Sequence, residues 1–201
     1  MESRVEPRDS ADDFPTPPWA LRALMRHALF DPTVKSGSVL EPACGRGHMA
    51  RALDEFFAVV TAADKFDYGY GGVRDFLSEP YAAGCVDWVI TNPPFIHAEA
   101  FVIEALRVAR RGVAIFARAS FAESLGRLDN LFRPHPPSAV VTFPERVPLL
   151  KGRVLRRAST ATAYGWFIWQ KGVVGGSRHL WIPECRKALE RDDDYDVDPD
   201  A

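Results

Sequence analysis

The sequence lacks the features that stabilise secreted or membrane-spanning proteins. Only three of its 201 residues are cysteines, and Cys44, Cys85 and Cys185 are too widely spaced for a disulfide framework or a zinc motif. It has no run of about 18 apolar residues, so no membrane helix is expected. The first residues lack the basic-then-apolar pattern of a signal peptide. We therefore expect a cytoplasmic protein with reduced thiols and no structural metal.

The net charge is small, at −2, but it is unevenly distributed. Residues 1–13 hold five acids and two arginines, and residues 190–201 hold seven acids and one arginine, which gives −3 and −6. Subtracting both ends leaves +7 for residues 14–189. We expect disordered acidic arms at 1–13 and 190–201 and a single domain at 14–189. Its basic charge suits a polyanionic partner or an ordinary solvated surface.

Strand-like and helix-like segments alternate along the chain, and no internal repeat is present. Helical spacing of apolar residues occurs at 16–30, 97–111 and 120–132. Short apolar runs predict strands at 37–43, 57–64, 73–77, 85–92, 112–117, 138–143 and 161–170. This alternation predicts an α/β protein with a largely parallel sheet.

A glycine turn follows the first predicted strand, in VLEPACGRGHMARAL (39–53). Gly45 and Gly47 allow a sharp turn and close approach of the backbone to a ligand, although glycines also occur in purely structural turns. Glu41 precedes them and can hold a cationic group. Asp64 ends the second strand, where an acid suits ribose hydroxyls or a helix cap, and Asp75 suits an adenine amine or a turn.

These residues resemble the first motif of class I S-adenosylmethionine-dependent methyltransferases, in its Glu-Pro form. The resemblance implies a Rossmann-like seven-stranded sheet of order 3-2-1-4-5-7-6, with strand 7 antiparallel and helices on both faces. It also implies S-adenosylmethionine as the cofactor. The cofactor-binding residues it implies are Thr16, Pro17, Glu41, Ala43, Cys44, Gly45, Gly47, Asp64, Asp75, Phe76 and Asn92.

Asn92-Pro93-Pro94-Phe95 follows the fourth predicted strand, at the end of the sheet where ligands bind. It resembles the catalytic motif of methyltransferases that modify exocyclic amines. The Asn92 side-chain carbonyl and the Pro93 backbone carbonyl can each accept an amine hydrogen and orient the nitrogen lone pair towards the methyl donor. The prolines make the loop rigid, and Phe95 offers a stacking face. A proline-rich turn is the structural alternative.

DFPTPPWA (13–20) resembles the F-x-T-P segment found ahead of the glycine motif in adenine-modifying enzymes. By this resemblance Thr16 and Pro17 border the methionine part of the cofactor, although both residues also suit a helix start. The order F-x-T-P, glycine motif, NPPF resembles the adenine amino-methyltransferases of DNA. RNA adenine, a protein glutamine amide, and nucleic-acid binding on a degenerate fold remain alternatives.

A cluster of cations lies between the sixth and seventh predicted strands, in residues 145–159. Lys151, Arg153, Arg156 and Arg157 there are candidate phosphate contacts, or part of a solvated loop. The catalytic core uses almost the whole chain, so no separate target-recognition domain is expected. Only the 144–160 loop and the 120–132 helix are left to read bases.

Overall fold

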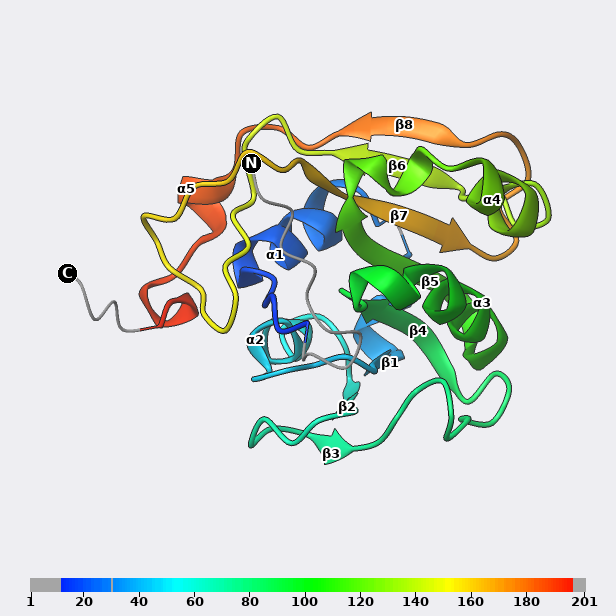
Figure 1. Cartoon of the computed structure of the whole chain (residues 1–201), viewed down its shortest axis with the longest axis horizontal. Coiled ribbons are helices and arrows are strands. Elements are labelled where there is room, and N and C mark those ends of the chain that lie inside the picture. Colours follow the sequence, from blue (N-terminus) through cyan, green and yellow to red (C-terminus); the bar gives the residue numbers. More distant parts are fainter. Residues whose placement is uncertain (1–11, 30, 197–201) are drawn as a thin grey trace.

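The computed structural model describes residues 12–29 and 31–196. The expected arm at 1–13 therefore lies outside the described residues except for Asp12 and Asp13, and so does 197–201 of the expected tail. The described residues form one mixed sheet with helices on both faces (Figure 1).

The sheet has eight strands in the described part of the chain, in the order β3-β2-β1-β4-β5-β7-β6-β8. β7 is antiparallel to β5 and β6, and the other neighbouring pairs are parallel. The strands are β1 (Ser38–Glu41), β2 (Val59–Asp64), β3 (Gly72–Val73), β4 (Val86–Thr91), β5 (Ala109–Arg118), β6 (Ala139–Thr142), β7 (Tyr164–Gln170) and β8 (Arg178–Trp181).

The predicted order of the first seven strands and the reversed direction of the seventh are confirmed, but the predicted strand count is wrong. β8 is an additional edge strand that pairs in parallel with β6. Three of its four side chains are exposed, and only Leu180 packs against the core. Its sequence therefore carries no apolar run from which a strand could be predicted.

The central strands are buried on both faces, as predicted for 85–92. Trp88 and Ile90 of β4 pack on one face, while Val89 packs on the other. This alternation repeats along β5 and β7, so every second side chain enters the same core. The two cores fix the register of the strands and hence where each strand ends.

Three helices cover the first face and one longer helix covers the second. α1 (Pro18–His27), α2 (His48–Leu53) and α5 (Arg186–Leu189) contribute to the core with Trp88, whereas α3 (Ala98–Val108) packs on the face with Val89. α1 begins after Pro17, and the Thr16 side chain makes no capping bond. The predicted helix at 97–111 ends early because β5 starts at Ala109.

The segment after β5 is less regular than predicted. In place of one helix at 120–132 there are three short turns: η3 (Ala119–Ala122), α4 (Leu125–Arg127) and a π-type turn, η4 (Leu128–Phe132). Only Phe121 and Leu131 of these turns are buried, so packing does not enforce one continuous helix. The 145–159 loop forms only an isolated bridge between Leu150 and Arg153.

The described part of the expected acidic tail, 190–196, is docked and not disordered. η5 (Asp192–Asp194) lies against α1, where Asp194 is 5% exposed and its carboxylate bonds both terminal nitrogens of Arg22, at 2.7 and 2.9 Å. Arg22 also pairs with Glu55 at 2.8 Å. The partners are 172 residues apart, so sequence pattern gives no sign of this contact.

Candidate functional site

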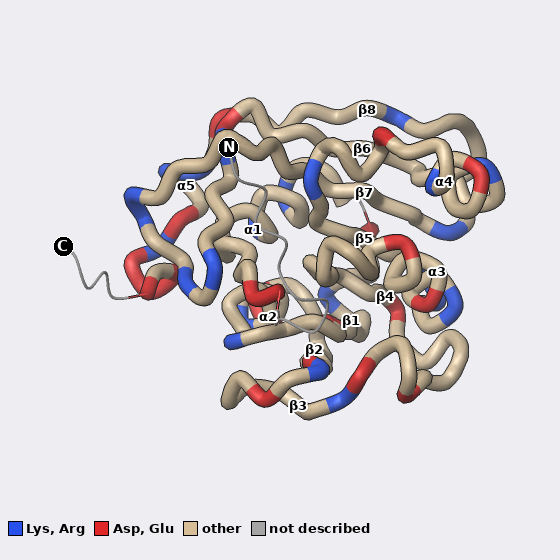
Figure 2. Tube along the Cα trace, in the orientation of Figure 1, with Lys and Arg blue, Asp and Glu red and all other residues tan. Residues whose placement is uncertain are grey.

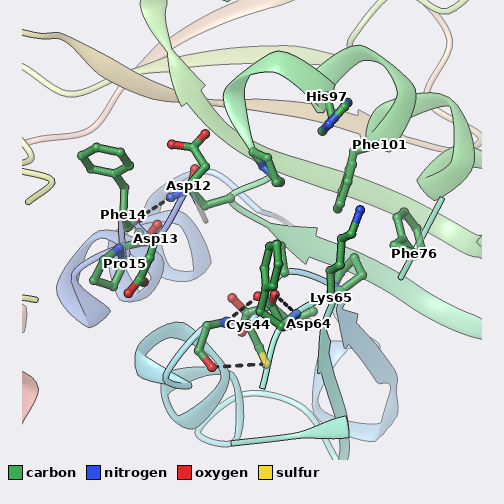
Figure 3. Close-up of a pocket in the computed structure, with 18 of the residues that line it drawn as sticks. Asp12, Asp13, Phe14, Pro15, Cys44, Asp64, Lys65, Phe76, His97 and Phe101 are labelled. Atoms are coloured by element: carbon green, nitrogen blue, oxygen red, sulfur yellow. Dashed lines mark hydrogen bonds between the residues drawn. The ribbon is translucent and has the colours of Figure 1, made fainter. Parts of the chain in front are cut away.

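A cavity of about 890 Å³ opens where β1, β2, β4 and β5 end. Figure 3 shows Asp12 to Pro15, from the segment before α1, on one side of it and Phe76 and Phe101 on the other. The predicted site residues that line it are Thr16, Glu41, Ala43, Cys44, Gly45, Asp64, Asp75, Phe76, Asn92, Pro94 and Phe95. Pro17, Gly47 and Pro93 do not line it.

The glycine turn joins β1 to α2 and places Gly45 at the cavity wall. Gly45 and Gly47 have φ angles of 49° and 81°, in the left-handed region that favours glycine. The Gly45 N–H donates to Asp64 at 2.9 Å, which ties the turn to the end of β2. A Cβ on Gly47 would lie 2.5 Å from the Tyr70 ring, so Gly47 shapes the turn from outside the cavity.

Two aspartates mark the next strand ends. Asp64 accepts bonds from the N–H groups of Gly45 and Phe66, at 2.9 and 3.0 Å, but burial raises its pKa in spite of them. Asp75 pairs with Lys65 at 3.2 Å. Burial opposes ionisation of Asp75, yet its bonds from Leu77 N–H and Lys65 bring its pKa below the usual value.

Glu41 is the most unusual group in the cavity. It is 2% exposed, and its Oε2 atom has no hydrogen-bond partner. Burial, and then the Asp64 carboxylate, raise its pKa well above the usual value. A cationic group entering the cavity would favour the ionised form and fill the missing contact.

Unpartnered buried polar atoms gather around this cavity. Six side chains in the described part of the chain have such an atom, and four of them, those of Thr16, Glu41, His48 and Asn92, line the cavity. Buried polar groups normally have partners, because an unmade bond costs about 1–3 kcal/mol. This concentration indicates a ligand site.

Cys44 also lines the cavity, but it has no reactive character. Burial, with further contributions from the Glu41 and Asp64 carboxylates, raises the pKa of its thiol to about 12. A raised pKa keeps the thiol protonated at neutral pH, which disfavours a role as a nucleophile. No group of three or more His, Cys, Asp or Glu in the described segments is arranged to hold a metal ion.

The Asn92-Pro93-Pro94-Phe95 loop is held from several sides. Asn92 Nδ2 donates to the Phe14 carbonyl at 2.8 Å, which leaves its buried Oδ1 without a partner. The Pro94 carbonyl accepts from His97 N–H at 2.9 Å, whereas no described residue donates to the Pro93 carbonyl. The Phe95 N–H donates to Asp12 at 2.8 Å. The Asn92 side-chain oxygen and the Pro93 carbonyl therefore have no described donor, although Pro93 is buried and does not line the cavity.

Sequence reasoning missed part of the wall around Phe95. Its ring lies 5.7 Å from that of Phe14 and 6.3 Å from that of Tyr164, and the Arg118 guanidinium lies 4.2 Å above it. Arg118 is the last residue of β5, so the rule that ligands bind beyond the carboxyl ends of strands could have found it. Phe14 lies within the F-x-T-P segment already noted.

The candidate phosphate contacts lie outside the cavity. Lys151, Arg153, Arg156 and Arg157 are exposed, and Lys151 and Arg153 flank Gly152, whose N–H donates to the Asp13 carbonyl at 2.8 Å. Since Asp13 lines the cavity, this part of the loop borders it. Arg156 instead pairs with Asp192 at 2.5 Å (in Figure 2 the segment around α5 carries both acidic and basic residues).

Solved structures with this fold include several methyltransferases. No protein-family model and no curated protein matches the chain in sequence. The modification subunit of a "putative type I restriction enzyme" from Vibrio vulnificus has a TM-score of 0.62 and 16% identity, over 90% of this chain and 49% of that one. This chain thus spans about half of its length.

Two further structures match most of the chain. A "putative RNA methyltransferase" from Pyrococcus horikoshii has a TM-score of 0.57 and 14% identity, over 86% of this chain and 93% of that one. A "putative class I S-adenosylmethionine-dependent methyltransferase" from Listeria monocytogenes has a TM-score of 0.51 and 13% identity, over 85% and 67%. The fold is that of the class I methyltransferases.

No helix among the described residues is long and apolar enough to cross a membrane.

Proposed function

We propose that this chain is an S-adenosylmethionine-dependent methyltransferase that modifies the exocyclic amine of adenine in DNA. The observation that carries this proposal is the orientation of the Asn92 amide. Its nitrogen donates to the Phe14 carbonyl, its buried oxygen has no hydrogen-bond donor, and Asn92 lines the cavity. The fold, the acidic cofactor cavity and the basic loop support the same function.

The cavity fits S-adenosylmethionine in both size and charge. An isolated buried carboxylate is costly, so the unpartnered Glu41 oxygen suits the cationic amino-acid part of this cofactor. Asp64 would accept hydrogen bonds from the ribose, and Asp75 would lie near the adenine. Gly45 leaves room for close approach of the backbone. When bound, the cofactor supplies an electrophilic methyl group on a sulfonium sulfur.

The loop after β4 would orient the acceptor amine. An adenine amine is a weak nucleophile because its lone pair is delocalised into the ring. Asn92 Oδ1 accepts one amine hydrogen and the Pro93 carbonyl accepts the other, which favours a pyramidal nitrogen with its lone pair directed at the methyl group. The nitrogen lone pair would form the new bond to the methyl group as the methyl–sulfonium bond breaks and S-adenosylhomocysteine leaves, and the methylated nitrogen would then release a proton to water. No strong general base is required.

Two observations favour nucleic acid as the substrate. The exposed cations around Gly152 border the cavity, where they can contact phosphates. A restriction-modification subunit and an RNA methyltransferase are among the structures with this fold, so RNA adenine is the second candidate. We further propose that the 145–159 loop and the 119–132 turns contact the bases around the target.

The test is methyl transfer from labelled S-adenosylmethionine to duplex DNA, single-stranded DNA and total RNA, with the modified nucleosides identified by mass spectrometry. We expect methyladenine in DNA. Asn92→Ala should lower kcat by at least about 100-fold, since an oriented acceptor of this kind contributes about 2.7–4 kcal/mol. Its affinity for S-adenosylhomocysteine should stay within about threefold of the wild-type value.

Gln170→Ala is the matched control, because Gln170 also carries a side-chain amide but ends β7 and does not line the cavity. This variant should retain full activity. Near-normal transfer by Asn92→Ala would remove the proposed mechanism. Label in RNA alone would change the substrate but keep the chemistry. Cofactor binding without label in either nucleic acid would redirect the search to protein glutamine or to a binding role.

A further inference from the structure

Arg118 is a cavity residue to which the proposed function gives no role. It ends β5 beside the loop that follows β4, and its side chain is exposed. Its guanidinium carbon lies 4.2 Å from the centre of the Phe95 ring, within the range of a cation–π contact. It also lines the cavity, so it stands where a substrate enters.

The charges around the cavity make Arg118 unusual. Asp12, Asp13, Glu41, Asp64 and Asp75 all line it, and these acids oppose entry of a phosphodiester. Two lysines or arginines of the described residues line it: Lys65, which is paired with Asp75 at 3.2 Å, and Arg118.

No carboxylate of the described residues lies within ion-pair distance of Arg118. An ion pair close to this wall joins a different arginine, Arg46, to Asp13 at 3.6 Å. Arg118 interacts with the Tyr164 hydroxyl, but this partner is neutral, so the Arg118 charge has no carboxylate partner among the described residues and can bind an incoming anion. Its charge also offsets part of the repulsion from the neighbouring acids.

The position of Arg118 also bears on how a target ring enters. The proposed reaction needs a planar ring stacked on Phe95, but the guanidinium already lies over that ring. A guanidinium is planar and stacks on aromatic faces, so it occupies the place that the target base requires. The backbone of Phe95 is held separately by Asp12 at 2.8 Å, so the loop does not depend on Arg118.

We infer that Arg118 is a substrate-binding residue: it lies on Phe95 until the target base enters, and it then binds the phosphate beside that nucleotide. This inference rests on the proposed function, because it takes the ring on Phe95 to be a nucleobase. It narrows the substrate to a nucleotide within a strand, since a glutamine side chain carries neither a ring nor a phosphate. Arginine suits this role through its bidentate contact with phosphate.

The test compares Arg118→Gln, Arg118→Lys and the wild-type protein. Gln keeps a flat group near Phe95 but removes the charge, and Lys keeps the charge. The first readout is affinity for a fluorescent single-stranded oligonucleotide, measured between about 50 and 200 mM salt, a range over which phosphate contacts weaken strongly. The second readout is kcat and KM for methyl transfer to the same oligonucleotide.

We expect Arg118→Gln to weaken oligonucleotide affinity and to raise KM by about tenfold, while kcat changes by less than about threefold. The slope of log affinity against log salt should fall by about 0.7, the share of one phosphate contact on a single strand. Arg118→Lys should restore the slope. Affinity for S-adenosylhomocysteine should not change in either variant.

Arg26→Gln is the matched control, since it removes the same charge at the exposed end of α1, away from the cavity. It should leave both affinity and slope unchanged. An unchanged slope in Arg118→Gln would overturn the inference, and so would an equal loss in Arg26→Gln. The binding readout needs no turnover: a wild-type protein that binds the oligonucleotide in this way but never methylates it would refute the proposed function alone.

Discussion

Two buried carboxylates of this protein have opposite surroundings. Glu41 is 2% exposed and Asp194 is 5% exposed, so both are removed from water. Asp194 accepts two bonds from Arg22, and its region of the molecule is a closed ion-pair network with Glu55. Glu41 has an oxygen with no partner and an acidic neighbour in Asp64.

The difference separates a structural site from the proposed binding site. Folding alone satisfies Asp194, so its network holds 190–196 against α1. Glu41 is left in a state that folding does not satisfy, and a stable protein tolerates such a group where a ligand completes it. Burial alone does not distinguish these roles, whereas burial together with hydrogen-bond satisfaction does.

The largest effect is expected from breaking the satisfied network. Arg22→Met leaves Asp194 and Glu55 without their buried partner, and breaking a buried pair in this way costs about 3–5 kcal/mol. Urea unfolding should show most of this loss in the free energy of unfolding. The loss is smaller if 190–196 detaches from α1, because Asp194 then returns to water. Limited proteolysis should then cut within 190–196.

The double variant Arg22→Met/Asp194→Leu is the control for this prediction. It removes both buried charges and should recover more than half of the lost stability, because replacing a buried pair by apolar groups is often neutral. A single Arg22→Met variant as stable as the wild-type protein would show that the network does not hold the segment.

A smaller effect is expected at Glu41, where substitution should weaken ligand affinity and leave stability intact. Glu41→Gln should weaken affinity for S-adenosylhomocysteine by about 10- to 100-fold, since a charged hydrogen bond contributes about 1.5–3 kcal/mol. Stability without ligand should not fall. Isothermal titration calorimetry and urea unfolding measure the two quantities, and Glu123→Gln, on an exposed residue outside the cavity, is the control.

The raised pKa of Glu41 also predicts how the stability of the ligand-free protein changes with pH. The folded-state pKa of Glu41 lies above its usual value of 4.5, so its contribution to stability is full below about pH 4.5 and is lost as pH rises through the folded pKa. The wild-type protein without ligand should therefore lose stability relative to Glu41→Gln as pH rises. Parallel stability curves, or unchanged ligand affinity, would remove Glu41 from the cofactor site.

The sequence alone predicted the buried strands and the residues that lie at their ends. The apolar runs predicted the buried strands β4 and β5 and placed Glu41, Asp64 and Asn92 at strand ends that the structure brings to one cavity. The sheet order was implied by the resemblance alone. The missed parts depend on distant partners. β8 has a single side chain packed against the core. In the sequence Asp194 resembles a solvated surface acid, because its partner Arg22 is 172 residues away.

The smallest effect is expected at Asp192, which shares η5 with Asp194 but has a 99% exposed side chain. Its pair with Arg156, at 2.5 Å, is a surface contact, so Asp192→Asn should change stability by less than about 0.5 kcal/mol. If Arg156 contacts phosphate, its release should raise oligonucleotide affinity by about two- to threefold at low salt, measured by fluorescence anisotropy.

Asp193→Asn is the control for this prediction, because it changes the same charge one residue away and should have the smaller effect. Equal gains in both variants would mean that only the net charge of 190–196 matters and that Arg156 is not a specific contact.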